Sequence, residues 1–213
     1  MPATVIAGVE VPDSSVARDI TELVRSSAPP LLYNHSRRVF LWGSLRGRRR
    51  GMSYDPELLY VGALCHDLGL TGRFAKSEQR FELDGADEAR RLLLEHGVAP
   101  ERARLVWEAI ALHTTPEVPW RMAPEIALVT AGVELDVLGF GYDEVSEEER
   151  AQVTAEHPRP DFKREILRAF TDGMAHRPDS VFGTVNADVL GHFLPGFERV
   201  DFVDTILESQ WPE

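Results

Sequence analysis

Cysteine and lysine are both scarce in this chain of 213 residues. Cys65 is the single cysteine, so no disulfide can form within the chain, and we expect a reducing, cytoplasmic location. The N-terminal residues lack basic side chains and a long apolar core, so they do not read as a secretory signal. The chain also lacks any apolar run of about 18 residues, and a membrane span is therefore not expected.

Positive charge is in short supply as well, because the formal net charge is -12 and lysine occurs only at Lys76 and Lys163. Proteins that bind nucleic-acid backbones or anionic membranes need basic surface, so we expect neither partner. The short basic run 46–51 is interpreted as a solvated loop after a helix. A small-molecule substrate is the partner that we expect, and homo-oligomerisation stays open.

Strand-like alternation at period two is almost missing. Residues 3–11 are the only plausible strand, and a lone strand is not expected to persist. Apolar residues instead recur at helical spacing between caps, prolines and glycines, which predicts an all-α fold of about ten helices. These helices are expected after Asp13 or Ser14, over 31–45, 56–66, 85–96, 100–113 and 124–138, after Ser146, after Asp161, and near 187–193 and 200–207.

Five polar residues fall on the apolar faces of these predicted helices: His35, His66, Asp67, His113 and Asp136. Each alone is typical of a hydrogen-bonded core residue or a cap. Together they would bury imidazoles and carboxylates, which costs several kcal/mol unless a cation compensates. Because few arginines share those faces, the pattern favours a metal ion. Mixed nitrogen and oxygen ligands suit zinc first, with iron, manganese, cobalt and nickel as alternatives.

The order His35, then His66-Asp67, then Asp136 resembles the H…HD…D signature of the HD-domain superfamily of metal-dependent hydrolases. The resemblance covers about residues 33–138. It implies one HD-type helical domain over 1–213, a bundle with a core near 31–140 and helical elaborations on both sides. The same resemblance implies that His35, His66, Asp67 and Asp136 ligate the metal.

The flanking words "NHSRRVFLWG", "ALCHDLGLT", "RFELDGADEAR", "IALHTTPEVP" and "ELDVLG" resemble the cyanamide hydratase branch. In that branch one metal, usually zinc, activates water that adds to the nitrile carbon and yields urea. Dimetal relatives carry a histidine where this chain has Phe81, which favours a mononuclear site. Mononuclear nucleotidases carry an acid where this chain has Leu70, which disfavours that activity.

The residues expected to act on substrate follow from this chemistry. Asp67 would ligate the metal and hydrogen-bond the water, and His113 would move a proton, as imidazole side chains commonly do near neutral pH. Arg38, Lys76 and Thr114 are predicted to contact substrate. Among the neighbours, Asp84 is expected to cap a helix, Glu82 to lie behind the site or at the surface, Arg37 and Arg80 at the surface, Cys65 to be buried and inert, and His157 to have no role.

Three functions stay open at this point. The first is a metal-dependent hydratase or hydrolase of a small nitrile-type substrate. The second is a phosphohydrolase acting on nucleotides or other phosphate esters, which would need cations converging on the metal. The third is an inactive, metal-stabilised helical regulatory module, whose metal would be closed by protein ligands.

Overall fold

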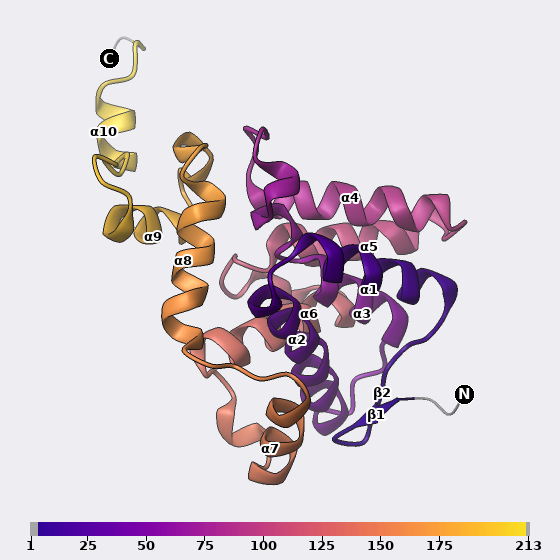
Figure 1. Ribbon diagram of the computed structural model, residues 1–213. Helices are drawn as coiled ribbons and strands as arrows, with labels where there is room; N and C mark the ends of the chain where they lie inside the picture. Colours follow the sequence, from indigo (N-terminus) through magenta and orange to yellow (C-terminus); the bar gives the residue numbers. More distant parts are fainter. Residues whose placement is uncertain (1–3, 212–213) are drawn as a thin grey trace.

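Helices make up most of the computed structural model, which describes residues 4–211 (Figure 1). The all-α prediction is confirmed, with ten α-helices in this described part. Their bounds are α1 (Ser15–Ser27), α2 (Pro30–Arg49), α3 (Pro56–Cys65), α4 (Phe81–Glu95), α5 (Pro100–Leu112), α6 (Pro124–Val133), α7 (Glu147–Glu156), α8 (Phe162–Met174), α9 (Asn186–Phe193) and α10 (Phe202–Leu207). Short turns connect them: η1 (Leu68–Leu70), η2 (Gly72–Phe74), η3 (Val118–Arg121), the π-helical η4 (Glu134–Leu138), η5 (Tyr142–Glu144) and η6 (Pro178–Val181). No helix within 4–211 combines the length and the apolar character needed to cross a bilayer.

The N-terminal strand prediction needs a correction. Strands β1 (Val5–Ile6) and β2 (Val9–Glu10) pair antiparallel with each other, so the segment persists as a small hairpin. Ala7 and Gly8 form its turn, both with positive φ, of 48° and 72°. The extended segment folds back on itself because the glycine adopts this conformation without strain.

Helix ends follow the caps in most places. The side chain of Ser14 caps α1, Asp55 caps α3, and Ser146 forms a capping box with Glu149 at the start of α7. Asp161 makes no side-chain cap at α8, contrary to expectation, because its own φ is 48°.

Helix α2 lies at the centre and packs against α3 and α6, while α5 packs against α4 and α6 (Figure 1). The approach of α2 to α6 is very close. A Cβ atom on Gly132 would lie 2.2 Å from the carbonyl oxygen of Val39, and one on Gly43 would lie 2.5 Å from that of Leu128. Glycine at these positions lets the two backbones meet and brings the start of α2 near the turn that follows α6.

The C-terminal helices α8 and α9 belong to a second apolar cluster, which also includes Leu32, Leu70 and Phe81. A buried ion pair between Arg177, which follows α8, and Asp84 of α4 ties these helices together. Asp84 was expected to cap α4, but it does not. It lies inside the first turn of this helix, where Ser77 and Gln79 also donate to it.

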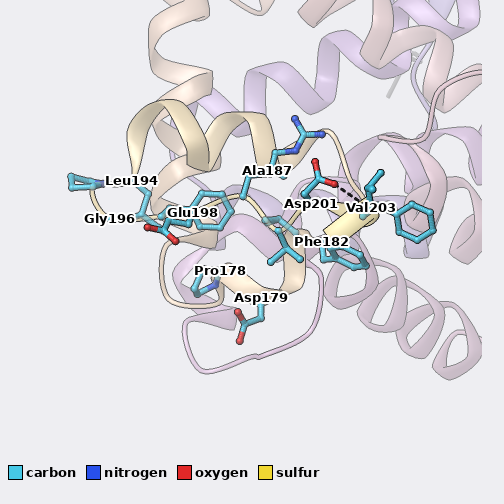
Figure 2. A pocket seen from close by; sticks show the side chains of 16 residues that line it. Pro178, Asp179, Phe182, Ala187, Leu194, Gly196, Glu198, Asp201 and Val203 are labelled. Atoms are coloured by element: carbon cyan, nitrogen blue, oxygen red, sulfur yellow. Dashed lines mark hydrogen bonds between the residues drawn. The ribbon is translucent and has the colours of Figure 1, made fainter. Parts of the chain in front are cut away.

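Residues 198–211, which include α10, are exposed throughout. Figure 2 shows the hollow of about 780 Å³ that this stretch forms with η6 and α9. Its lining is mostly apolar, with acidic groups such as Asp179, Glu198 and Asp201, and none of the predicted site residues lies there. This hollow is therefore not the metal site that the sequence predicts.

Candidate metal centre

Three buried side chains present ligand atoms to one another. His35 comes from α2, His66 directly follows α3, and Asp67 precedes η1. The Nε2 atoms of His35 and His66 lie 3.1 Å apart, and they lie 3.5 and 3.2 Å from Oδ2 of Asp67. Bonds of about 2.0–2.1 Å at a tetrahedral ion would separate ligand atoms by about 3.3 Å. These three residues therefore fit a divalent ion.

The hydrogen bonds behind the imidazoles determine which nitrogen is free. Nδ1 of His66 donates to the carbonyl oxygen of Ala63 at 2.8 Å, and Nδ1 of His113 donates to that of Ile110 at 2.6 Å. Nδ1 of His35 donates to a carboxylate at 2.7 Å. Because each Nδ1 carries the proton, each neutral ring leaves a bare lone pair on Nε2. All three Nε2 atoms lie within 3.7 Å of an oxygen of Asp67.

The centre is costly without a cation. Both oxygens of Asp67 and Nε2 of His113 are buried without any hydrogen-bond partner. Burial by itself raises the pKa of Asp67, but the adjacent imidazoles of His66, His113 and His35 outweigh it and hold the pKa well below its usual value. Asp67 is thus ionised, and an unpaired buried carboxylate is unfavourable by several kcal/mol. A divalent ion would compensate this charge and use the bare lone pairs.

Asp136 lies next to this group but not in it. Its Oδ2 accepts from Nδ1 of His35 and from Nη2 of Arg38, at 2.7 and 2.8 Å. Its Oδ1 accepts from Nε of Arg38 and Nε1 of Trp42, both at 2.8 Å. The carboxylate therefore contacts the nitrogen of His35 that points away from Asp67. Burial raises the pKa of Asp136, but His35 and Arg38 outweigh it and lower it. The structure thus places Asp136 behind a ligand, and its ligand role stays a prediction from the signature.

The three residues predicted to contact substrate differ in their surroundings. Arg38 is fully buried and committed to Asp136 and to the carbonyl oxygens of His157 and Pro158. Lys76 is exposed. Thr114 follows His113 and donates to Glu82 at 2.6 Å.

Glu82, expected behind the site or at the surface, belongs to a hydrogen-bond network that the sequence did not predict. Glu82 is fully buried, and it accepts from Arg80, Thr114 and Asn186 at 2.9, 2.6 and 3.0 Å. Burial raises its pKa, but the hydrogen bond from Arg80 and the other partners outweigh it and lower it. No local signal in the sequence indicates this network, because Asn186 reaches Glu82 from the start of α9.

Arg37 is likewise buried, and it donates to the hydroxyl of Tyr60, so its assignment to the surface was wrong. His157 was given no role, yet it is buried beside Arg37 and Arg38. Burial and these two charges lower the pKa of His157 to about 4. Burial raises the pKa of the Cys65 thiol to about 12, so the thiol next to His66 stays protonated.

A helical bundle that buries two imidazoles and a carboxylate around one point is compatible with a divalent-metal site. The family model for the HD domain matches residues 32–156, more than half of the chain, and the chain therefore belongs to the HD-domain family. This membership confirms the resemblance to the superfamily of metal-dependent hydrolases. No curated protein matches the chain, so the comparisons support no particular branch.

Proposed function

We propose that this protein uses one divalent ion, zinc in the first place, to hydrate a small neutral nitrile such as cyanamide. The observation that carries the proposal is the absence of cations at the ligand group. Within residues 4–211, Asp67 forms ion-pair contacts with histidines alone, and Arg38 is engaged by Asp136. Transfer of a phosphoryl group needs cations around its oxygens, whereas a neutral nitrile does not.

The walls of the centre support a very small substrate. The ring of Phe162 lies 5.3 Å from that of His35, and the ring of Phe81 lies 5.6 Å from that of His113. The side chains at the centre are at most 4% exposed, which holds for His35, His66, Asp67 and His113. Phe81 offers no ligand atom and packs on Phe170 as well, which supports a mononuclear site.

Hydration of a nitrile has no leaving group, so the site has to deliver hydroxide to carbon and a proton to nitrogen. A bound divalent ion would lower the pKa of water toward about 7 and so supply hydroxide at neutral pH. His35, His66 and Asp67 would hold the ion. The oxygen of Asp67 that does not hold the ion would accept a hydrogen bond from the attacking water and orient it, and both oxygens lack another hydrogen-bond partner among the described residues.

His113 is the group that moves the proton. Its Nδ1 is held by the carbonyl oxygen of Ile110, so Nε2 is the atom that takes the proton from water and passes it to the nitrile nitrogen. The water then provides the carbonyl oxygen and both hydrogens of the product amide, which is urea when cyanamide is the substrate.

The test is urea formation from cyanamide by zinc-loaded protein. We expect His66→Ala to lose both zinc and activity. His113→Gln should keep zinc and lose activity by about a hundredfold or more, because general acid-base groups contribute at least that much. His192→Gln, on the exposed face of α9, is the matched control and should behave as the parent chain.

Two results would reject the proposal. Release of phosphate from nucleotides without urea from cyanamide would identify a phosphohydrolase. Tightly bound zinc together with no activity on either substrate would identify an inactive structural site.

A further inference from the structure

A cleft of about 490 Å³ lies where η4, α7 and the start of α8 meet, and we call it the η4 cleft. Trp42, Leu135 and Asp136 line it and are nearly buried, at 4, 6 and 4% exposed. Its volume is in the range of about 300–1,000 Å³ that is typical of small-molecule sites.

Three cations line this cleft, and of these Arg159 alone has a carboxylate within ion-pair distance in the part of the chain that the structure describes. Arg150 donates to the carbonyl oxygens of Tyr142 and Val145. Arg159 donates to the backbone oxygen of Asp136 at 2.7 Å, and its Nε is 4.0 Å from Oδ1 of that residue, beyond hydrogen-bond distance. Lys163 is exposed and makes no ion pair within residues 4–211.

Most other arginines are paired with acids, in a chain of net charge -12. Those that hydrogen-bond a carboxylate are Arg38, Arg46, Arg49, Arg50, Arg73, Arg80, Arg91, Arg102, Arg104, Arg177 and Arg199. Among the described residues, Arg150 and Lys163 have no acidic partner, and Arg159 has only the distant carboxylate of Asp136. The three cations in one hollow therefore repel one another, and a bound anion would relieve that repulsion. The uncapped N-terminus of α8 adds further positive potential beside Lys163.

The rest of the lining is apolar. Leu138 and Tyr142 stand at the rim and are 58 and 53% exposed. The π-helical turn η4 places Val137 and Leu138 there, and such turns are frequent at functional sites. A ligand that fits has an anionic group at one end and an apolar body at the other.

The η4 cleft adjoins the metal centre through Asp136, which lines it. Both oxygens of Asp136 are taken by Arg38, Trp42 and His35, so this layer closes the cleft on the side of Asp67. A ligand in the cleft therefore meets Arg159 and Lys163, and none of His35, His66 and Asp67 lines the cleft.

We propose that the η4 cleft binds a small phosphate monoester with an apolar or aromatic body. A monoester carries a charge of about -1.5 to -2 near neutral pH, which suits three cations opposed by the single unpaired acid Glu147. The phosphate lies against Arg150, Arg159 and Lys163, and the body lies against Leu138 and Tyr142.

The test is calorimetric titration of the metal-loaded protein with phenyl phosphate, inorganic phosphate and benzoate. We expect phenyl phosphate to bind more tightly than inorganic phosphate, because the body adds apolar contact, and more tightly than benzoate, because the carboxylate has less charge. Lys163→Glu should weaken phenyl phosphate by at least about tenfold, since it removes a charge-assisted contact and adds repulsion.

The matched control is Arg164→Glu, which makes the same charge change one residue along α8 at an exposed side chain outside the cleft. It should weaken binding far less than Lys163→Glu. His66→Ala should leave the binding of phenyl phosphate intact, because the cleft binds it without the metal. A phosphate that bound to the metal instead would lose its site in this variant. Equal loss in the two charge reversals, loss in His66→Ala, benzoate binding as tight as phenyl phosphate, or no binding at millimolar ligand would each overturn the proposal.

Discussion

At the scale of single residues, a variant of Asp136 tests whether this carboxylate ligates the metal or only holds the ligand His35 in place. We expect Asp136→Asn to lower metal affinity by about 10–100-fold, the effect usual for a partner behind a ligating histidine. The variant should also destabilise the fold by about 3–5 kcal/mol, because Arg38 loses the charge that balances it. Metal affinity is measured by competition with a chelator, and stability by urea unfolding.

Asp84→Asn is the control for this experiment. Asp84 is also a buried partner of an arginine, Arg177, but it touches no metal-centre histidine. It should reduce stability in the same way and leave metal affinity unchanged. Complete loss of metal in Asp136→Asn, as expected for His66→Ala, would show instead that the signature aspartate ligates directly.

His157 links a single side chain to the pH dependence of stability. Its pKa is about 4 in the folded protein and about 6.5 when unfolded. As pH falls from about 6.5 to about 4, the unfolded chain takes up a proton that the folded chain rejects, so stability falls in that window and is unaffected above it. The rejection follows from burial and from Arg37 and Arg38.

The variant His157→Gln should therefore lose less stability than the parent chain between pH 7 and pH 4.5. Urea unfolding at a series of pH values measures this, and the difference between the two curves removes contributions from other histidines. Parallel curves would mean that His157 is solvated and protonates normally in the fold.

At the scale of elements, the close approach of α2 and α6 brings His35 and Asp136 together. Gly132→Ala places a methyl group against the backbone oxygen of Val39, which cannot move independently of α2. We expect a loss of about 1–3 kcal/mol, as for other overpacked cores, together with weaker metal binding. Gly191→Ala in α9 is the control, because nothing lies within 4 Å of its added Cβ, and it should be neutral or stabilise by up to about 1 kcal/mol.

An unchanged metal affinity in a destabilised Gly132→Ala would show that the helix spacing does not position His35.

The helices also illustrate what local patterns predict well. Period 3.6 and the caps at Ser14, Asp55 and Ser146 were sufficient to place helices, because these signals act over a few residues. The start of α4 was missed by four residues, since Arg80 provides no cap and Phe81 to Asp84 are held by tertiary contacts.

At the scale of the whole molecule, the limit of the sequence is the pairing of distant polar groups. Adjacency alone marked His66 and Asp67, and helical spacing put His35 and His113 on inward faces. The partners that decide their roles lie far along the chain, as for Arg38 with Asp136 and for Asn186 with Glu82. Nothing in local periodicity encodes which carboxylate meets which arginine, so the pairing of Arg38 with Asp136 and the burial of Arg37 could not be predicted.

The metal should also contribute to the stability of the whole fold. Chelation would leave both oxygens of Asp67 and Nε2 of His113 without partners at the junction of α2, α3 and α5. A ligand at 1,000 times its Kd stabilises by about 4 kcal/mol, which corresponds to a rise in Tm of roughly 8–16 °C for a chain of this size. We expect a fall of this order in calorimetry when the metal is removed, and recovery when zinc is restored. His66→Ala should show the same Tm with and without chelator, because it has no complete site to lose. If the chelator did not change the Tm of the parent chain, protons and not a metal would neutralise Asp67. The centre would then be a hydrogen-bonded core of histidines.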